Sequence, residues 1–181
     1  MQAAIFLDRD GVIIENRPDY IRSWEDVLVY ERSLPALVRI SSSPYKIIIV
    51  TNQSAVGRGI LPLRTAQEIN GRLVNMIENA GGRIDGVFMC PHAPEENCEC
   101  RKPKPGLLYT AAQALGINLS SSIIIGDAIT DLLAGQEAGL MTRILLKTGR
   151  GRDQYNLASS MELKPFLVYE TLDDALQELY P

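Results

Sequence analysis

Two carboxylates stand close together near the N-terminus, Asp8 and Asp10, in the run AIFLDRDGVI. Asp8 directly follows an apolar segment, and Gly11 allows the backbone to turn sharply after Asp10. Two carboxylates held at the end of a strand repel each other unless a cation lies between them, and Mg²⁺ prefers such hard oxygen ligands. The pair indicates a magnesium site, although an acidic loop that only closes a strand-to-helix connection would show the same short motif.

Polar side chains also follow two other apolar segments. Thr51 and Asn52 end the run KIIIVTN, and Asp127 follows the run SIIIG, with Asp131 four residues later. A threonine hydroxyl at a strand end can donate to a phosphoryl oxygen. Asp127 and Asp131 share one face if a helix begins there.

A basic segment, CRKPKPG, supplies Arg101, Lys102 and Lys104, and its two prolines stiffen the backbone. A lysine directed into a carboxylate cluster would neutralise a bound phosphate. Carboxylates, a hydroxyl and a lysine together fit phosphoryl transfer, which needs a nucleophile, a metal ion and fixed positive charge. One aspartate can form an aspartyl-phosphate, while a second protonates the leaving oxygen and then activates water.

All three cysteines and the only histidine lie between residues 90 and 100. The spacing C-x-H-x5-C-x-C offers four soft or borderline ligands, which fit a closed, structural Zn²⁺ site made by Cys90, His92, Cys98 and Cys100. The alternative, reduced core cysteines beside a surface histidine, suits this segment poorly because it also holds two prolines and three glutamates. We expect the zinc loop to fix the geometry of the lysine that follows it.

The elements that must position these residues alternate along the chain. Buried strands are predicted over residues 3–7, 46–50, 87–89, 123–125, 144–146 and 166–169, and helices over 33–41, 65–79, 106–115, 131–138 and 172–179. The helix over 65–79 is expected to begin with a capping box of Thr65 and Glu68. This alternation predicts an α/β fold with a doubly wound, mostly parallel sheet, while residues 15–30 form a loop or flap over the strand ends.

Composition fits one globular domain over residues 1–181, with 46% hydrophobic and 22% charged residues and a net charge of −4. This charge disfavours nucleic-acid binding. No apolar run reaches the ~20 residues that span a bilayer, and the N-terminus lacks the regions of a signal peptide. We expect a soluble, cytoplasmic protein and, by default, a monomer.

The ordered motifs DRDG, TNQ, RKPKPG and GDxxxD resemble those of the haloacid dehalogenase (HAD) superfamily of phosphatases, over residues 6–131. The resemblance implies a Rossmann-like fold without a large cap domain. It implies that Asp8 is the nucleophile, Asp10 the general acid/base, Thr51 the phosphoryl-binding hydroxyl and Lys102 the neutralising cation. Asp127 would bind Mg²⁺ together with Asp8 and the backbone carbonyl of Asp10.

A HAD domain with such a zinc loop is similar to the D-glycero-D-manno-heptose 1,7-bisphosphate 7-phosphatases and the histidinol-phosphate phosphatases. By that resemblance the 7-phosphate of the heptose is the expected substrate group, and substrate contacts come from Arg9, Asn52, Gln53, Ser54 and Arg101. Residues 16–20 would line the same cleft. Two departures bear on the substrate, because Ala55 stands where glycine is common and Ala128 where a basic residue is common.

Three other functions stay open on the sequence alone. Histidinol phosphate is the nearest rival substrate within the same chemistry. Removal of a terminal phosphate from nucleic acid is disfavoured by the acidic charge balance and the lack of interleaved aromatic and basic residues. A zinc-stabilised binding module without catalysis would not require the full set of Asp8, Asp10, Thr51, Lys102 and Asp127.

Overall fold

Six strands form one parallel sheet in the computed structural model, which describes residues 1–158 and 163–180. The strands are β1 (Ala4–Leu7), β2 (Lys46–Asn52), β3 (Gly86–Cys90), β4 (Ile123–Gly126), β5 (Thr142–Leu146) and β6 (Leu167–Tyr169). Their order is β3-β2-β1-β4-β5-β6, and every neighbouring pair is parallel. This order places β1 at the centre, where the winding of the chain reverses direction, and ligands of open α/β sheets bind at that reversal.

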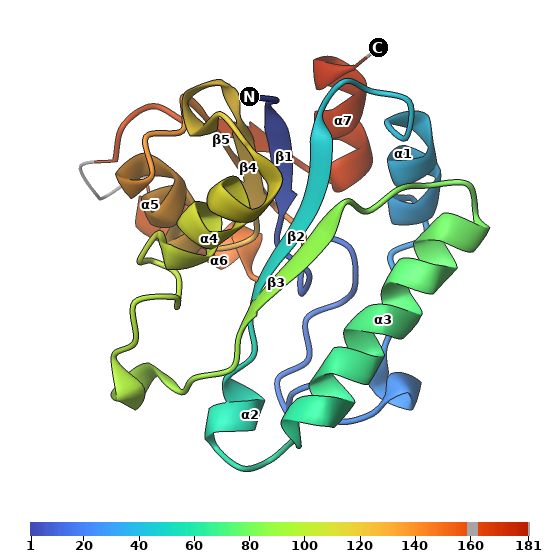
Figure 1. Cartoon of the computed structure of the whole chain (residues 1–181), viewed down its shortest axis with the longest axis vertical. Helices are drawn as coiled ribbons and strands as arrows, with labels where there is room; N and C mark the ends of the chain where they lie inside the picture. The colour runs from blue at the N-terminus through green and yellow to red at the C-terminus, as the bar shows by residue number, and fades with distance from the viewer. Residues whose placement is uncertain (159–162, 181) are drawn as a thin grey trace.

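Helices cover both faces of the sheet (Figure 1). On one side lie α1 (Ser33–Arg39), α3 (Leu63–Asn79) and α7 (Leu172–Leu179), and on the other α4 (Gly106–Leu115), α5 (Ile129–Glu137) and α6 (Gly151–Ala158). The short helix α2 (Ser54–Gly57) follows the end of β2. Three 3₁₀ turns complete the described elements, at Trp24–Asp26, Pro94–Glu96 and Leu119–Ser121. None of the described helices is long and apolar enough to cross a membrane.

Alternate residues of β1 enter two separate hydrophobic cores. Ile5 and Leu7 pack in the core that includes residues of α1, α3 and α7, whereas Ala4 and Phe6 pack with residues of α4 and α5. All four side chains are buried. The strand is apolar without alternation because both of its faces are covered, as the sequence predicted.

The register of the sheet gathers the strand ends. Leu7 lies beside Ile49 of β2 and Ile125 of β4, and the backbone N–H of Asp8 donates to the carbonyl of Ile125 at 2.9 Å. The residues that follow these three positions therefore reach the same edge of the sheet. The predicted strand-end clusters meet there.

Several predicted boundaries were wrong. Helix α3 begins at Leu63 with Pro62 as its extended N-cap residue, so Thr65 lies inside the first turn and the predicted capping box does not form. Helix α5 begins at Ile129, two residues early, because the Asp131 carboxylate accepts from the Ala128 N–H at 3.1 Å and caps the first turn. Helices α2 and α6 were not predicted.

Candidate active site

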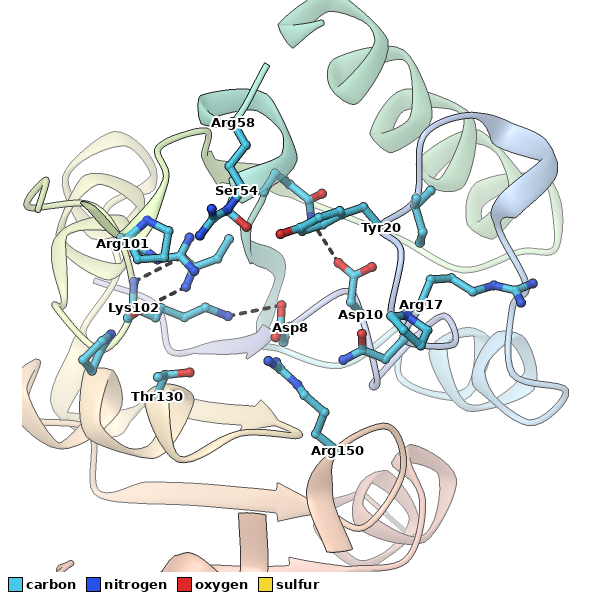
Figure 2. A pocket seen from close by; sticks show the side chains of 17 residues that line it. Asp8, Asp10, Arg17, Tyr20, Ser54, Arg58, Arg101, Lys102, Thr130 and Arg150 are labelled. Carbon is cyan, nitrogen blue, oxygen red and sulfur yellow. Dashed lines mark hydrogen bonds and ion pairs between the residues drawn. The ribbon is translucent and has the colours of Figure 1, made fainter. Parts of the chain in front are cut away.

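A pocket of about 660 Å³ opens at the carboxyl end of the sheet. Asp8 and Asp10 line it from the β1 end, Asn52 from the end of β2, and Lys102 from the segment before α4 (Figure 2). The loop over residues 16–21 contributes Asn16, Arg17, Pro18, Tyr20 and Ile21 to the lining of the pocket. The loop therefore lies beside the strand ends, where the sequence predicted a flap.

Lys102 joins two of the carboxylates. Its ammonium lies 3.1 Å from Asp8 Oδ1 and 2.6 Å from Asp131 Oδ1, and it donates to the carbonyl of Val50 at 2.8 Å. All three side chains that form these ion pairs are at most 8% exposed. Burial alone would lower the pKa of Lys102, but Asp131 and Asp8 outweigh burial and raise it. Lys102 is therefore a fixed positive charge beside Asp8.

Asp8 has a strongly perturbed acidity. Burial is the largest cause and raises its pKa to about 7, against the opposing effect of Lys102. The carboxylates of Asp131, Asp127 and Asp10 also contribute to this rise. A cation bound beside this cluster would stabilise the ionised form of Asp8 and lower its pKa.

Asp8, Asp127 and Asp131 can each offer one oxygen, and these oxygens lie within 4.8 Å of one another. This all-oxygen donor set fits a hard divalent cation. The approach is close, since a Cβ on Gly11 would lie 2.1 Å from Asp127 Oδ2, and Gly11 also has a φ of +83°. The close approach of Asp127 and the positive φ each require a glycine at this position. The Asp10 side chain contacts Arg9 and Gln53 and is not part of this group of oxygens, so its backbone carbonyl is the candidate ligand.

Arg150 lines the pocket, although no motif of the sequence predicts it. Its backbone N–H donates to Asp127 Oδ2 at 2.9 Å, and its Nη2 lies 3.2 Å from Asp127 Oδ1. Burial raises the pKa of Asp127, and Arg150 opposes that rise. The Arg150 side chain is 56% exposed and reaches toward Asp8 from the loop after β5 (Figure 2). Its position just after a strand next to β4 is the signal that could have found it.

Thr51 lies behind the pocket near the end of β2, and Gln53 follows β2 and lines the pocket. Thr51 is fully buried, and its hydroxyl oxygen accepts from Gln53 Nε2 at 2.8 Å, which leaves its own O–H free to donate. The same Gln53 nitrogen donates to Asp10 Oδ2 at 2.8 Å. Gln53 therefore links Thr51 of β2 to the carboxylate of Asp10.

Asn52 clamps the lysine segment to β2. Its side-chain oxygen accepts from the backbone N–H of Lys102 at 3.1 Å, and its amide donates to the Lys102 carbonyl at 3.0 Å. This two-way contact holds the Lys102 backbone in place. Ser54, the next predicted substrate contact, also lines the pocket.

Arg9 does not reach the pocket, contrary to its predicted substrate contact. It is 1% exposed, and its guanidinium pairs with Asp10 and with Asn70 of α3. The residue after Asp8 turns into the core because the chain bends there, so Arg9 packs behind Asp10. The sequence offered no signal for Asn70.

Three other arginines do line the pocket, namely Arg101, Arg58 and Arg17. Arg101 donates to the carbonyl of His92 at 3.1 Å, and Arg58 lies 2.9 Å from Glu95. Figure 2 shows both on the side of the pocket opposite Arg150. Arg17 lies at the rim, where its Nε donates to the carbonyl of Asp26.

The three cysteines and the histidine converge in one cluster. Neighbouring ligand atoms lie 3.3–3.6 Å apart, with His92 Nδ1 next to Cys100 Sγ and Cys90 Sγ next to Cys98 Sγ. A tetrahedral zinc site with bonds of about 2.3 Å has edges of roughly 3.8 Å, so the four atoms are placed to surround one ion. Burial would raise the pKa of Cys98, but hydrogen bonds from Cys100 and Cys90 outweigh it and bring that pKa to about 7. The donor set therefore fits zinc.

Sequence comparison places the chain among phosphatases. A family model described as HAD-hydrolase-like matches residues 99–175. The chain is 35% identical to a D-glycero-beta-D-manno-heptose-1,7-bisphosphate 7-phosphatase of Pseudomonas aeruginosa, over 83% of this chain and 84% of that protein. It is 39% identical to the enzyme of the same name from Helicobacter pylori strain J99, over 79% and 82% of the two chains.

Structural comparison agrees with the sequence relatives. The crystal structure of D,D-heptose 1,7-bisphosphate phosphatase from Bordetella bronchiseptica, complexed with magnesium and phosphate, superposes with a TM-score of 0.90. The two chains are 31% identical, and the match covers 98% of this chain and 97% of the other. The similarity thus extends over the sheet, both helical layers and the loops that form the pocket.

Proposed function

The chain belongs to the HAD-like family of D-glycero-β-D-manno-heptose-1,7-bisphosphate 7-phosphatases, and we propose that it removes the 7-phosphate of that sugar bisphosphate. It is a phosphoric monoester hydrolase. One observation carries the assignment of the reacting group: Asp8 lies at the central strand end, 3.1 Å from the buried Lys102 ammonium and beside a second carboxylate in the pocket.

Asp8 is the nucleophile in this proposal. One of its carboxylate oxygens attacks the phosphorus, the bond from phosphorus to the sugar oxygen breaks, and an aspartyl-phosphate forms. Asp10 gives its proton to the departing sugar oxygen, which leaves as an alcohol. In this proposal Lys102 and the Thr51 hydroxyl stabilise the charge on the phosphoryl oxygens.

Water completes the reaction. Asp10, now a carboxylate, takes a proton from a water molecule that attacks the phosphorus of the aspartyl-phosphate. The bond between phosphorus and Asp8 breaks, which releases inorganic phosphate and restores both side chains. The enzyme therefore returns to its starting protonation state after each turnover.

Two metal ions fit the chain's donor groups. Mg²⁺ would be held by Asp8, Asp127 and the backbone carbonyl of Asp10, and it would shield the negative charge of the phosphoryl group. The related Bordetella structure, which contains magnesium and phosphate, supports this choice. Zn²⁺ would be held by the Cys90, His92, Cys98 and Cys100 cluster in a structural role, since four protein ligands leave no position open for water.

The remaining basic side chains suit a second phosphate. Arg101 and Arg58 line the pocket away from Arg150, so a sugar that carries phosphates at both ends can meet positive charge at each. Asn52, Gln53 and Ser54 add polar side chains to the lining of the same pocket. Because the relatives' names specify the β anomer, we expect the β-1,7-bisphosphate to be the preferred substrate.

The test is Mg²⁺-dependent phosphate release across a substrate panel, with Asp8→Asn as the control. The panel contains both anomers of heptose 1,7-bisphosphate, fructose 1,6-bisphosphate, histidinol phosphate and a 3′-phosphorylated oligonucleotide. Preference for the β-heptose bisphosphate supports the proposal. Preference for histidinol phosphate or the oligonucleotide would contradict the proposed substrate. Zinc-loaded, folded protein that hydrolyses none of these would instead indicate a binding module.

A further inference from the structure

We propose that Arg9 is a positioning residue that orients Asp10 for proton transfer, and that Asn70 of α3 in turn holds Arg9. This inference rests on the proposed phosphatase activity, in which Asp10 serves as acid and base. It gives Arg9 a role without substrate contact, and it extends the catalytic apparatus into the helix behind the pocket.

The contacts form a continuous chain. Arg9 Nε donates to Asp10 Oδ2 at 3.1 Å, and Arg9 Nη2 donates to Asp10 Oδ1 at 3.2 Å. The remaining guanidinium nitrogen, Nη1, donates to Asn70 Oδ1 at 2.7 Å. All three nitrogens of the guanidinium are thus used within one planar group, and the fork fixes the plane of the carboxylate.

The two oxygens of Asp10 have different surroundings. Oδ2 accepts from both Arg9 Nε and Gln53 Nε2, whereas Oδ1 accepts only from Arg9 Nη2 in these contacts. A carboxylate oxygen has about two lone-pair positions, so Oδ2 is filled and Oδ1 keeps one position free. Oδ1 is therefore the atom that carries the proton to the leaving group.

Asn70 occupies a position where an apolar residue would otherwise pack. The buried face of α3 carries Ala66, Ile69, Leu73 and Ile77, and Asn70 lies among them at 7% exposure. Its amide nitrogen lies 3.5 Å from Met89 Sδ, which leaves its oxygen turned to Arg9. A buried guanidinium that lost this acceptor would keep an unpaired N–H, so Asn70 has a specific partner to satisfy.

The choice of leaving group distinguishes a misplaced Asp10 from general damage to the fold. A sugar oxygen is a poor leaving group and needs the proton of Asp10, whereas p-nitrophenolate leaves without one. The value of kcat/KM reports the steps up to the aspartyl-phosphate, so it isolates this first proton transfer. A misplaced Asp10 must therefore impair the sugar phosphate and spare the aryl phosphate.

The experiment measures kcat/KM on p-nitrophenyl phosphate and on the sugar phosphate that the unmutated enzyme hydrolyses best, for Arg9→Met, Asn70→Leu and Asn70→Asp. We expect Arg9→Met and Asn70→Leu to lose about 10- to 100-fold on the sugar phosphate and less than about 3-fold on the aryl phosphate. Asn70→Asp keeps an oxygen acceptor and should retain the behaviour of the unmutated enzyme. Arg143→Met is the matched control, because Arg143 is also buried but donates to the carbonyls of Leu140 and Pro165.

Equal losses on both substrates, or a loss in Asn70→Asp as large as in Asn70→Leu, would overturn the inference while leaving the phosphatase assignment intact. A double-mutant cycle on thermal unfolding tests the contact without turnover. The Tm shifts of Arg9→Met and Asn70→Leu should sum to more than the shift of the double variant, since the two residues share one interaction. Additive shifts would contradict the contact, whatever the activity.

Discussion

The Lys102 ammonium lies 3.1 Å from the Asp8 carboxylate, with both side chains buried at the end of the central strand. Lys102 follows the Cys/His cluster by two residues, whereas Asp8 directly follows β1 near the N-terminus. The proposed nucleophile and its neutralising charge therefore meet only when the sheet and the loop that carries the Cys/His cluster are both formed.

Asp8→Asn should abolish turnover without loss of stability. The amide cannot attack phosphorus, so activity should fall by at least about 10³-fold. Because burial raises the pKa of Asp8, its ionised form is unfavourable in the metal-free protein, and a neutral side chain should leave the Tm equal or higher. Phosphate release and a thermal scan check both effects, and retained activity would remove Asp8 as the nucleophile.

Magnesium affinity should depend on pH near neutrality. The pKa of Asp8 is about 7 in the metal-free protein, against 3.8 for a free side chain. Only the carboxylate binds a cation, so Mg²⁺ must displace the proton, and its apparent affinity should fall about tenfold per pH unit below pH 7. By the same shift, the contribution of Asp8 to the stability of the metal-free protein rises as pH falls from 7 toward 4.

Calorimetric titration with Mg²⁺ in buffers of different ionisation enthalpy measures the proton release directly. We expect close to one proton per Mg²⁺ at pH 6 and much less at pH 8.5. Asp8→Asn is the control that should release none at this site. An affinity that is constant from pH 6 to 8 would contradict the raised pKa.

Cys98→Ser should lower zinc content and stability together. Loss of one thiolate ligand weakens the site, and a stability loss of about 2 kcal/mol shifts the Tm of a chain of this size by roughly 5 °C. Glu99→Gln is the matched control, since this neighbouring side chain is 89% exposed and pairs with Lys104 rather than with the cluster. Metal analysis of unmutated protein prepared without chelator must show about one zinc per chain, and its absence would refute the site.

Arg150→Met should raise KM for the substrate about tenfold with a smaller effect on kcat. We expect the exposed guanidinium to contact a phosphoryl oxygen, and a charge-assisted hydrogen bond is worth roughly 1.5 kcal/mol or more. Affinity for Mg²⁺ should not fall, because the removed group carries the same sign as the ion. Arg152→Met is the control, since Arg152 is 77% exposed and lies 3.6 Å from Glu170 instead.

The strand ends were predictable because a buried parallel strand leaves a continuous apolar run that stops at its polar end. Asp8, Thr51 and Asp127 each follow such a run, and the sheet register brings them to one edge. Arg150 was not predicted because its loop carries no motif, and the position of Arg9 depends on how the chain bends after Asp8. Asn70 could not be found from sequence, since its partner lies 61 residues away.

Helix starts were harder to predict for a physical reason. Thr65 and Glu68 have the residue types of a capping box, but Pro62 supplies an extended backbone three residues earlier and Glu68 pairs with Arg64 instead. Local residue types permitted two starts, and the tertiary position of α3 selected one.

Successive side chains of β1 face opposite helical layers, so this strand sets both the packing of the core and the position of Asp8. Ile5 and Leu7 face one helical layer, Phe6 faces the other, and Asp8 follows in the same two-residue period. A one-residue insertion or deletion in this strand would exchange the two faces and move Asp8 relative to Lys102 at the same time. Variant libraries of this segment should thus accept many apolar substitutions but no change of length.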